Sequence, residues 1–417
     1  MSYRRGSSLT GPHRVVVTGA GIVTSMGFGW QSNAEGFRTG KTALRPITVF
    51  DTARQRVHTG GEVILDQNLP AHRLSARQTA RLDRATKLML HAGLEAMQQA
   101  TWYGEDLADV PLCLGTSAGA MSLGEIYYKQ KTLAPSNQRG LARLVLGYQP
   151  QTQAQHLAEA VGIRGPISII TNACASGANA IGHGFHLIKG GRARRAFCGG
   201  YDALSEMVFA GFDSLQALST TTPRPFAADR DGLALGEGAA MVTLERYDDA
   251  IARGATILAE VTGYGTSTDL HHLTQPHPQG DAALRSMNQA CLEAEVGPEQ
   301  IGYINSHGTG TPLNDVAEGS AIRRWAGDLA PQIRVSSTKG AIGHLLGGAG
   351  AVEAVICLMA IGGGWIPPNV PISEIDPIVN FDLVQASRDA VITHALTNSF
   401  GFGGSNATLI IRRMVGP

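Results

Sequence analysis

The sequence has 417 residues, of which 43% are hydrophobic and 16% charged, a composition that supports a large core and excludes an intrinsically disordered chain. The 34 basic residues balance the 34 acidic ones, so no overall charge attracts nucleic acid or an anionic membrane. Five widely spaced cysteines form no CxxC pair, and the first residues lack the apolar core of a signal peptide. We therefore expect a reducing, cytoplasmic location.

Short β-type runs alternate with longer helical segments, a pattern that predicts an α/β fold. In chain order, the predicted strands cover residues 14–19, 110–115, 167–171, 239–245, 257–265, 302–308, 333–337 and 406–413. The predicted helices cover residues 76–100, 178–189, 280–294 and 349–360. The most apolar window, 341–364, contains His344 and Glu353 and is rich in glycine, so we interpret it as a buried helix and not as a membrane span.

The two parts of the chain repeat each other in order. VVVTGAG is matched by AEVTGYG, PLCLGTSAG by GYINSHGTG, ISIITNACASG by RVSSTKGAIGH, and AMVTLER by ATLIIRR. A period of about half the chain predicts two similar α/β halves, residues 1–256 and 257–417. Chance similarity between glycine-rich segments is the alternative. In a duplicated fold, loops at the ends of the strands are expected to meet at one site.

The two TG-x-G turns do not predict a dinucleotide site. GAGIVT and GYGTST both lack the third glycine of G-x-G-x-x-G, and no acidic residue follows at the offset of a ribose contact. The sequence therefore argues against a nicotinamide or flavin cofactor.

Cys174 lies between a predicted strand and a predicted helix, in NACASG. The N–H groups and the dipole of a first helical turn favour a thiolate, and small neighbours give a substrate access to the sulfur. A buried structural cysteine is the alternative, and this context alone leaves both interpretations open.

Two histidines lie in corresponding places of the second half. His307 follows GYI in NSHGTGT, and His344 follows Lys339 by five residues in SSTKGAIGH. Asp315 and Glu318 follow His307 and are candidates for an ion pair with Lys339. A cysteine and two histidines on converging loops suit a nucleophile with acid/base or hydrogen-bonding partners.

Near the end of the chain, NSFGFGGSNA places Phe400 and Phe402 in a glycine-hinged loop. A turn with packed aromatic side chains and a mobile gate over an apolar tunnel both fit this composition.

These motifs together resemble the β-ketoacyl-acyl-carrier-protein synthases, and most closely the elongating, KAS II-like members and their type II polyketide relatives. The resemblance is carried by NACASG, HGTGT, SSTKGAIGHLLGGAG, NSFGFGGSN and the intervening RPFAADRDGLALGEGAA, and it covers nearly the whole chain from Arg14 to Arg413. It implies a thiolase-like fold of duplicated α/β halves in αβαβα layers, usually found as a dimer.

The resemblance also implies roles for individual residues. Cys174 would accept an acyl group from the phosphopantetheine thioester of an acyl carrier protein, and the backbone N–H groups of Cys174 and Phe402 would form the oxyanion hole, with Phe400 in the gate. His307 and His344 would then hydrogen-bond the thioester carbonyl of a malonyl-carrier substrate. Loss of CO2 gives an enolate that attacks the acyl thioester and extends the chain by two carbons.

Supporting residues follow from the same resemblance. Lys339 would orient the site through Glu318, while Thr309 and Thr311 would hold the pantetheine arm. No metal or organic cofactor is expected, since the substrate itself supplies the carbanion. His271, His272 and His277 form no known metal-ligand spacing.

The expected partners are an acyl carrier protein and a second synthase subunit, in a homodimer or a heterodimer with a chain-length-factor-like homologue. Nucleic acid and membrane are not expected. Residues 73–87 carry five basic side chains at mostly helical spacing; a solvated surface is one interpretation, and docking of the acidic carrier through Arg77 and Arg81 is the other.

Two positions depart from the family pattern. Ala118 stands in the acyl pocket where fatty-acid members often carry a bulkier aliphatic residue, which suggests room for a wider acyl chain, as in a polyketide or polyene. Asn172 stands where we expect threonine.

Three related activities are disfavoured. A non-catalytic chain-length factor lacks the nucleophilic cysteine, a decarboxylating loading enzyme usually has glutamine there, and a thiolase uses a second cysteine as a base. This chain keeps Cys174, and neither Cys291 nor Cys357 lies in a thiolase-like context.

Overall fold

The computed structural model describes residues 12–66, 68–133 and 140–414. Its main sheet has the strand order β13-β11-β10-β15-β16-β9-β1-β8-β7-β5-β6, with β2 (Gly27–Phe28) paired to β1. The N-terminal strands are β1 (Val15–Thr24), β5 (Leu112–Gly115), β6 (Ile167–Ile170), β7 (Arg195–Asp202) and β8 (Gly238–Arg246). The C-terminal strands are β9 (Ala259–Thr268), β10 (Ile301–Asn305), β11 (Arg334–Ser336), β13 (Asp382–Leu383), β15 (His394–Phe400) and β16 (Ser405–Arg412).

The two halves of this sheet have the same topology. The order β1-β8-β7-β5-β6 is repeated as β9-β16-β15-β10-β11, and the halves meet where β1 pairs antiparallel with β9 at Val15–Val17. Each of the four sequence repeats falls on an equivalent pair: β1 and β9, β5 and β10, β6 and β11, β8 and β16. The predicted duplicated α/β architecture is confirmed.

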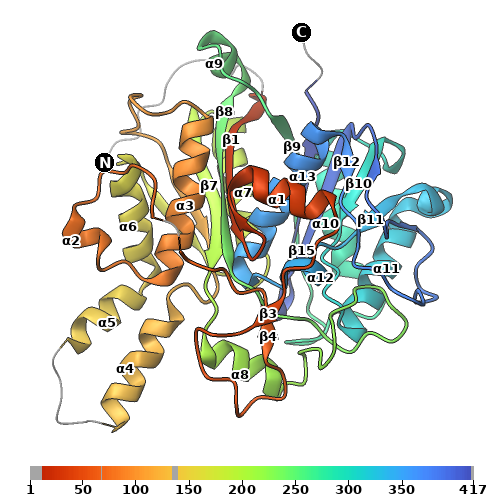
Figure 1. The fold of residues 1–417 in the computed structure, drawn as a ribbon. Helices are drawn as coiled ribbons and strands as arrows, with labels where there is room; N and C mark the ends of the chain where they lie inside the picture. Colours follow the sequence, from red (N-terminus) through yellow and green to blue (C-terminus); the bar gives the residue numbers. More distant parts are fainter. Residues whose placement is uncertain (1–11, 67, 134–139, 415–417) are drawn as a thin grey trace.

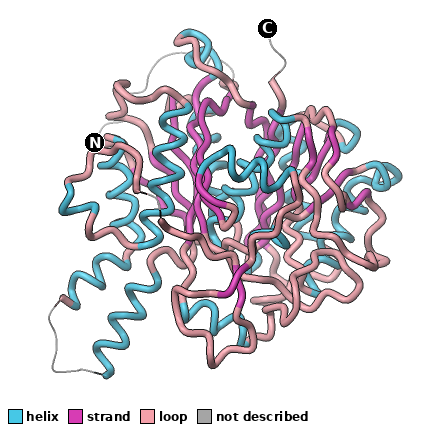
Figure 2. Tube along the Cα trace, in the orientation of Figure 1, coloured by secondary structure: helices cyan, strands magenta, loops and turns pink. Residues whose placement is uncertain are grey.

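The helices complete five layers (Figures 1 and 2). α7 (Ser176–Lys189) and α13 (Ala349–Gly363) pack against each other between the two half-sheets, α3 (Arg84–Gln99) covers β1 and β8, and α10 (Asp281–Ala294) covers β9 and β16. Every residue of α13 from Ala349 to Ile361 is buried, because a helix between two sheets has no solvent-facing side. The αβαβα layering is therefore as expected.

The remaining helices lie around these layers. They are α1 (Gly29–Arg38), α2 (Ala76–Thr79), α4 (Met121–Leu133), α5 (Leu141–Tyr148), α6 (Pro150–Val161), α8 (Glu206–Ser214), α9 (Tyr247–Ala252), α11 (Pro312–Ala326) and α12 (Lys339–Ile342). Pairs of short strands, β3 (Arg45–Pro46) with β4 (Thr59–Gly60) and β12 (Trp365–Ile366) with β14 (Arg388–Asp389), complete the fold.

Two expectations about elements were wrong. The single helix predicted for residues 76–100 is two helices, because Ser75 caps α2 and the side chain of Asp83 accepts from the N–H of Thr86 to begin α3. The equivalent strands β7 and β15 were missed: β7 contains the pair Gly199–Gly200, and β15 contains the polar run from Thr397 to Ser399, both of which weaken a strand pattern.

Among the described residues, one helical stretch has the length and composition of a membrane span, Leu346–Gly363, and 89% of it is buried inside the protein. This stretch is the layer-forming α13 and the turn before it, which agrees with its interpretation as a core helix. The boundary predicted at residue 256 lies between α9 and β9; whether the halves are separate domains stays a prediction.

Candidate active site

The residues that the sequence analysis assigns to the cavity and its loops lie at or just after the carboxyl ends of strands in the two half-sheets. Cys174 follows β6, His307 follows β10, Lys339 and His344 follow β11, Ala118 follows β5, and Phe402 follows β15, of which Phe400 is the last residue. Because the two half-sheets are related by the repeat, these ends converge on one place at the junction of the halves.

The cysteine lies on a strained turn. Ala173 has φ of +56°, a left-handed conformation that costs energy in a residue with a Cβ. Its carbonyl oxygen accepts from the hydroxyls of Ser176 at 2.6 Å and Ser117 at 2.9 Å, while Asn172 donates through its amide to the hydroxyl of Ser405 at 2.9 Å. These contacts hold Cys174 at the start of α7, as its strand–turn–helix context predicted.

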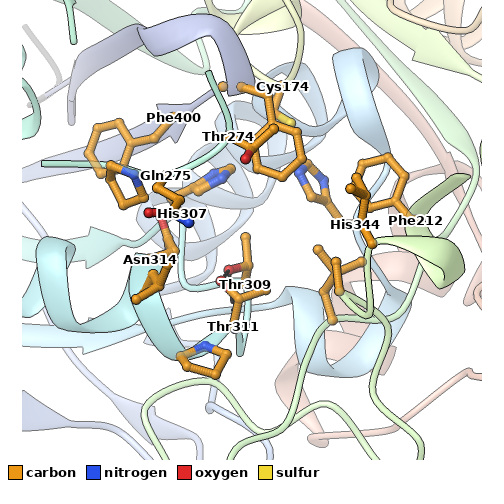
Figure 3. A pocket seen from close by; sticks show the side chains of 18 of the residues that line it. Cys174, Phe212, Thr274, Gln275, His307, Thr309, Thr311, Asn314, His344 and Phe400 are labelled. Atoms are coloured by element: carbon orange, nitrogen blue, oxygen red, sulfur yellow. Dashed lines mark hydrogen bonds between the residues drawn. The ribbon is translucent and has the colours of Figure 1, made fainter. Parts of the chain in front are cut away.

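Cys174, His307 and His344 line one cavity of about 320 Å³. A sulfur or nitrogen atom of each lies within 4.8 Å of one of the other two, and the two imidazole rings are 5.3 Å apart at an interplanar angle of 84°. Figure 3 shows the two rings on either side of the cavity below Cys174, with Thr309 and Thr311 farther along it. The cysteine and the two histidines are thus brought together as expected.

The sulfur rests as a thiol and not as the thiolate expected from the helix dipole. Burial raises the pKa of Cys174 to about 12, and the charge of Lys339 and a hydrogen bond from the N–H of Phe402 oppose this only in part. Cys174 is 8% exposed, so removal of water from a charged sulfur outweighs the favourable dipole. The nucleophile therefore needs a base during reaction.

Both histidines are neutral. Burial, followed by the charge of Lys339, holds the pKa of His307 and of His344 well below the ordinary value. The N–H of Leu346 donates to Nδ1 of His344, which assigns the ring proton to Nε2. Nε2 has no hydrogen-bond partner among the described residues. His344 therefore offers a free hydrogen-bond donor to the cavity. A metal ligand would need an unprotonated Nε2, so this tautomer does not suit metal binding.

Lys339 pairs with a residue that the sequence analysis did not choose. Its Nζ contacts a carboxylate oxygen of Glu353 on α13, and both side chains are at most 3% exposed. Glu318, the expected partner, instead accepts from the backbone N–H groups of His307 at 2.8 Å and Gly308 at 2.7 Å. The expected route from Lys339 through Glu318 is corrected accordingly: Glu318 fixes the backbone of the His307 loop.

Asp315 also pairs elsewhere. It accepts from the N–H of Phe226 at 2.8 Å and lies 3.7 Å from the guanidinium of Arg230. One signal in the sequence could have identified the missed Glu353, because a carboxylate inside an otherwise apolar helix needs a buried partner.

The glycine-hinged loop closes one side of the cavity. Phe400 packs against His307 with ring centroids 5.6 Å apart, and Phe402 stacks on Phe212 of α8 at 5.8 Å. Phe402 is 41% exposed while its N–H reaches the sulfur of Cys174. Phe212 was not selected from the sequence, since its partner lies almost two hundred residues away in the chain.

The remaining predicted residues lie at different distances from this centre. Thr309 and Thr311 line the cavity and share a hydrogen bond of 2.8 Å. Ala118 does not line it; this residue is 7% exposed and packs in a cluster with Phe209 and Leu346, against which Met121 also lies. The wider acyl pocket at Ala118 stays a prediction.

The basic segment is only partly available for docking. Arg77 on α2 and Arg81 are exposed, but Arg84 is held in an ion pair with the buried carboxylate of Glu237. Docking of a carrier at Arg77 and Arg81 stays a prediction.

Family models and solved structures match this chain over nearly its whole length. The β-ketoacyl synthase N-terminal domain matches residues 13–250, and the C-terminal domain matches residues 258–373. A 3-oxoacyl-[acyl-carrier-protein] synthase 2 of Synechocystis is 37% identical over 96% of this chain and 98% of its own. The ishigamide ketosynthase/chain length factor structure is 33% identical with a TM-score of 0.90 over 97% of this chain and 100% of its own. The structure AntDE:AntF, a type II polyketide ketosynthase bound to its acyl carrier protein and a hexaketide, is 27% identical with a TM-score of 0.87. It covers 97% of this chain and 100% of its own.

Proposed function

The chain belongs to the β-ketoacyl synthase family, and we propose that Cys174 is the residue on which it carries the growing acyl chain. The enzyme is a condensing acyltransferase: it joins an acyl group to malonyl-acyl carrier protein with loss of CO2, in fatty acid or type II polyketide synthesis. The observation that carries the assignment of Cys174 is its position in one cavity with two buried, neutral histidines.

In the first half-reaction, the sulfur of Cys174 attacks the carbonyl of an acyl-carrier thioester. The thiol proton passes to Nδ1 of His307, which has no partner among the described residues. His344 is not the acceptor, because its Nδ1 already accepts from Leu346 and its Nε2 carries a proton. The N–H groups of Cys174 and Phe402 stabilise the tetrahedral oxyanion. The carrier thiolate leaves and takes the proton from His307, so both histidines are neutral again.

In the second half-reaction, malonyl-acyl carrier protein enters the same cavity. Nε2 of His344 and an N–H of His307 donate to the thioester carbonyl. When the C–C bond to the carboxylate breaks and CO2 leaves, negative charge develops on that carbonyl oxygen, where the two donors stabilise it. The enolate carbon attacks the acyl carbonyl on Cys174. The sulfur leaves as a thiolate and takes a proton from the solvent, which restores the resting thiol, and the product on the carrier is two carbons longer.

The other predicted residues support these steps. Lys339, which is paired with Glu353, supplies a positive charge that lowers the cost of negative charge on the sulfur, and the carboxylate of Glu353 partly opposes this effect. Thr309 and Thr311 offer hydroxyls to the pantetheine arm along the cavity. Arg77 and Arg81 meet acidic side chains of the carrier. No step requires a metal or an organic cofactor.

Intact-mass analysis of the protein with a panel of acyl-carrier thioesters tests the proposal. We expect an acyl adduct on Cys174, followed by its disappearance and a two-carbon-longer product when malonyl-carrier is added. Cys174→Ala must take no adduct, whereas Cys291→Ala, which removes a buried cysteine outside the cavity, must behave as the unchanged protein. Absence of an adduct with every donor would refute the assignment and would favour a chain-length-factor-like role.

The second subunit is either another copy or a cysteine-less homologue. Mass measurement of the native protein, alone and with a chain-length-factor-like homologue, distinguishes the homodimer from the heterodimer.

A further inference from the structure

One carboxylate near the site is completely buried and has no role in the chemistry above. Asp202 is the last residue of β7 and is 0% exposed. Its two oxygens accept from five donors: the hydroxyl of Thr116 at 2.6 Å, and the backbone N–H groups of Ser117 at 3.0 Å, Ala118 at 2.8 Å, Gly119 at 2.6 Å and Gly347 at 2.6 Å.

No ion pair joins this carboxylate to a cation within the described part of the chain. Burial raises the pKa of Asp202, and the hydrogen bonds from the loop 116–119 oppose this shift. Hydrogen bonds from backbone N–H groups compensate a buried negative charge. A negative charge in the core without a counter-ion costs free energy unless hydrogen-bond donors stay in place around it. The position of the carboxylate therefore depends on the two loops, and the positions of the loops depend on the carboxylate.

The donors come from two loops that build the active site. Residues 116–119 follow β5, and within this loop the hydroxyl of Ser117 donates to the carbonyl of Ala173. That carbonyl belongs to the strained residue immediately before Cys174. A displacement of the loop would therefore release one of the contacts that maintain the turn under the nucleophile.

The fifth donor comes from the other half of the protein. Gly347 lies three residues after His344, next to Leu346, whose N–H fixes the tautomer of that histidine. Asp202 thus joins the loop on the cysteine side of the cavity to the loop on the histidine side.

We propose that Asp202 is a positioning residue for the condensation, which holds the loop 116–119, the turn at Ala173 and the turn after His344 in their reactive arrangement. This inference rests on the proposed roles of Cys174 and His344. It assigns to Asp202 no contact with substrate.

Asparagine is the informative replacement because it keeps the shape of the side chain but removes its charge and one of its acceptor oxygens. One acceptor oxygen becomes an NH2 group, which faces either Gly347 N–H or the N–H groups of Ala118 and Gly119, so donors oppose donors in both orientations. The loops must then separate on one side of the cavity. A displacement of about 1 Å can lower a rate about 100-fold.

The experiment compares Asp202→Asn, Asp202→Glu and Glu245→Gln with the unchanged protein. Glu245 is a matched control: it is also fully buried, but it lies at the opposite end of the β7–β8 pair and bonds to Thr18, Trp102 and Arg253. Folded, reactive sites are counted by alkylation of Cys174 and intact mass. Cys174 acylation, CO2 release from malonyl-carrier, and the KM and kcat of condensation are then measured per counted site.

For Asp202→Asn we expect both half-reactions to slow by about tenfold or more per site, with KM for the carrier substrates changed less than about twofold. Glu245→Gln should lose thermal stability but keep kcat per site. If Asp202→Asn does not fold, Asp202→Glu, which keeps the charge and lengthens the side chain, should still show a changed ratio of acylation to CO2 release. A folded Asp202 variant with unchanged rates per site would overturn the proposal. Failure of the unchanged protein to acylate Cys174 would instead refute the proposed function.

Discussion

The backbone N–H of Leu346 donates to Nδ1 of His344 at 3.2 Å. This contact leaves the proton of the neutral ring on Nε2, an atom without a partner among the described residues. The donor is therefore available to a thioester oxygen in the cavity. A hydrogen bond to an oxygen that becomes negatively charged is stronger than one to a neutral carbonyl, so this donor acts mainly in the transition state.

Replacement of His344 should therefore affect decarboxylation more than acylation. We expect His344→Ala to lower CO2 release from malonyl-carrier by about 100- to 1000-fold, as for loss of one oxyanion donor. Acylation of Cys174 by intact mass should change far less. His272→Ala is the control, because His272 also lines the cavity but bonds to Thr274. Equal losses in both half-reactions would contradict the separate role of His344.

Chemical modification should reveal the resting thiol. Burial raises the pKa of Cys174 to about 12, so the thiolate fraction should rise about tenfold for each pH unit well below that value. Iodoacetamide alkylation of Cys174, followed by mass spectrometry from pH 7 to pH 10, should increase throughout without a plateau. A plateau below about pH 8 would show that the thiolate is already the resting form.

The buried Lys339–Glu353 pair should be costly to break on one side only. Burial raises the pKa of Glu353 to about 7 against the opposing effect of Lys339. Lys339→Met leaves that carboxylate unpaired in the core and should lower the free energy of unfolding by about 3–5 kcal/mol. The double variant Lys339→Met with Glu353→Leu should recover part of this loss in urea unfolding. Additive losses in the double variant would indicate that the two side chains do not interact.

Acid stability should depend on Glu293. Burial alone would raise the pKa of this residue, but hydrogen bonds from His186 and Lys189 outweigh burial and lower the pKa to about 2. A carboxylate with a depressed folded pKa stabilises the protein above its unfolded pKa, and this contribution is lost as pH falls through the folded value. The difference in unfolding midpoint between the unchanged protein and Glu293→Gln should be largest above about pH 5 and should shrink toward about pH 2. A difference that does not vary with pH would contradict this assignment.

The size of the side chain at position 118 should affect acyl preference. Ala118→Ile adds bulk to a closely packed cluster and should lower the free energy of unfolding by about 1–3 kcal/mol. If the acyl chain passes this residue, the panel of acyl-carrier thioesters should shift toward shorter or narrower donors. Leu218→Ile, in the same cluster at nearly constant volume, controls for packing. An unchanged donor profile would exclude Ala118 from the acyl pocket.

The sequence alone predicted the repeat and the composition of the site. The repeated motifs are short and continuous in the sequence, so the matched pairs at β1 and β9 or at β6 and β11 could be recognised before any contact was known. For the same reason Cys174, His307 and His344 could be selected, each after a strand. What they do as a group depended on the resemblance to a known family.

Only the tertiary structure decided partners and protonation. Lys339 is 14 residues from Glu353 and 21 from Glu318 in the chain, and sequence separation cannot tell which carboxylate the fold brings to it. Likewise, the helix dipole at Cys174 can be inferred from local sequence, but the burial that outweighs it comes from residues of both halves that surround the sulfur. Local patterns record which groups are present and on which strand ends. Burial and hydrogen-bond partners depend on residues far apart in the chain, and these determine which atom carries a proton.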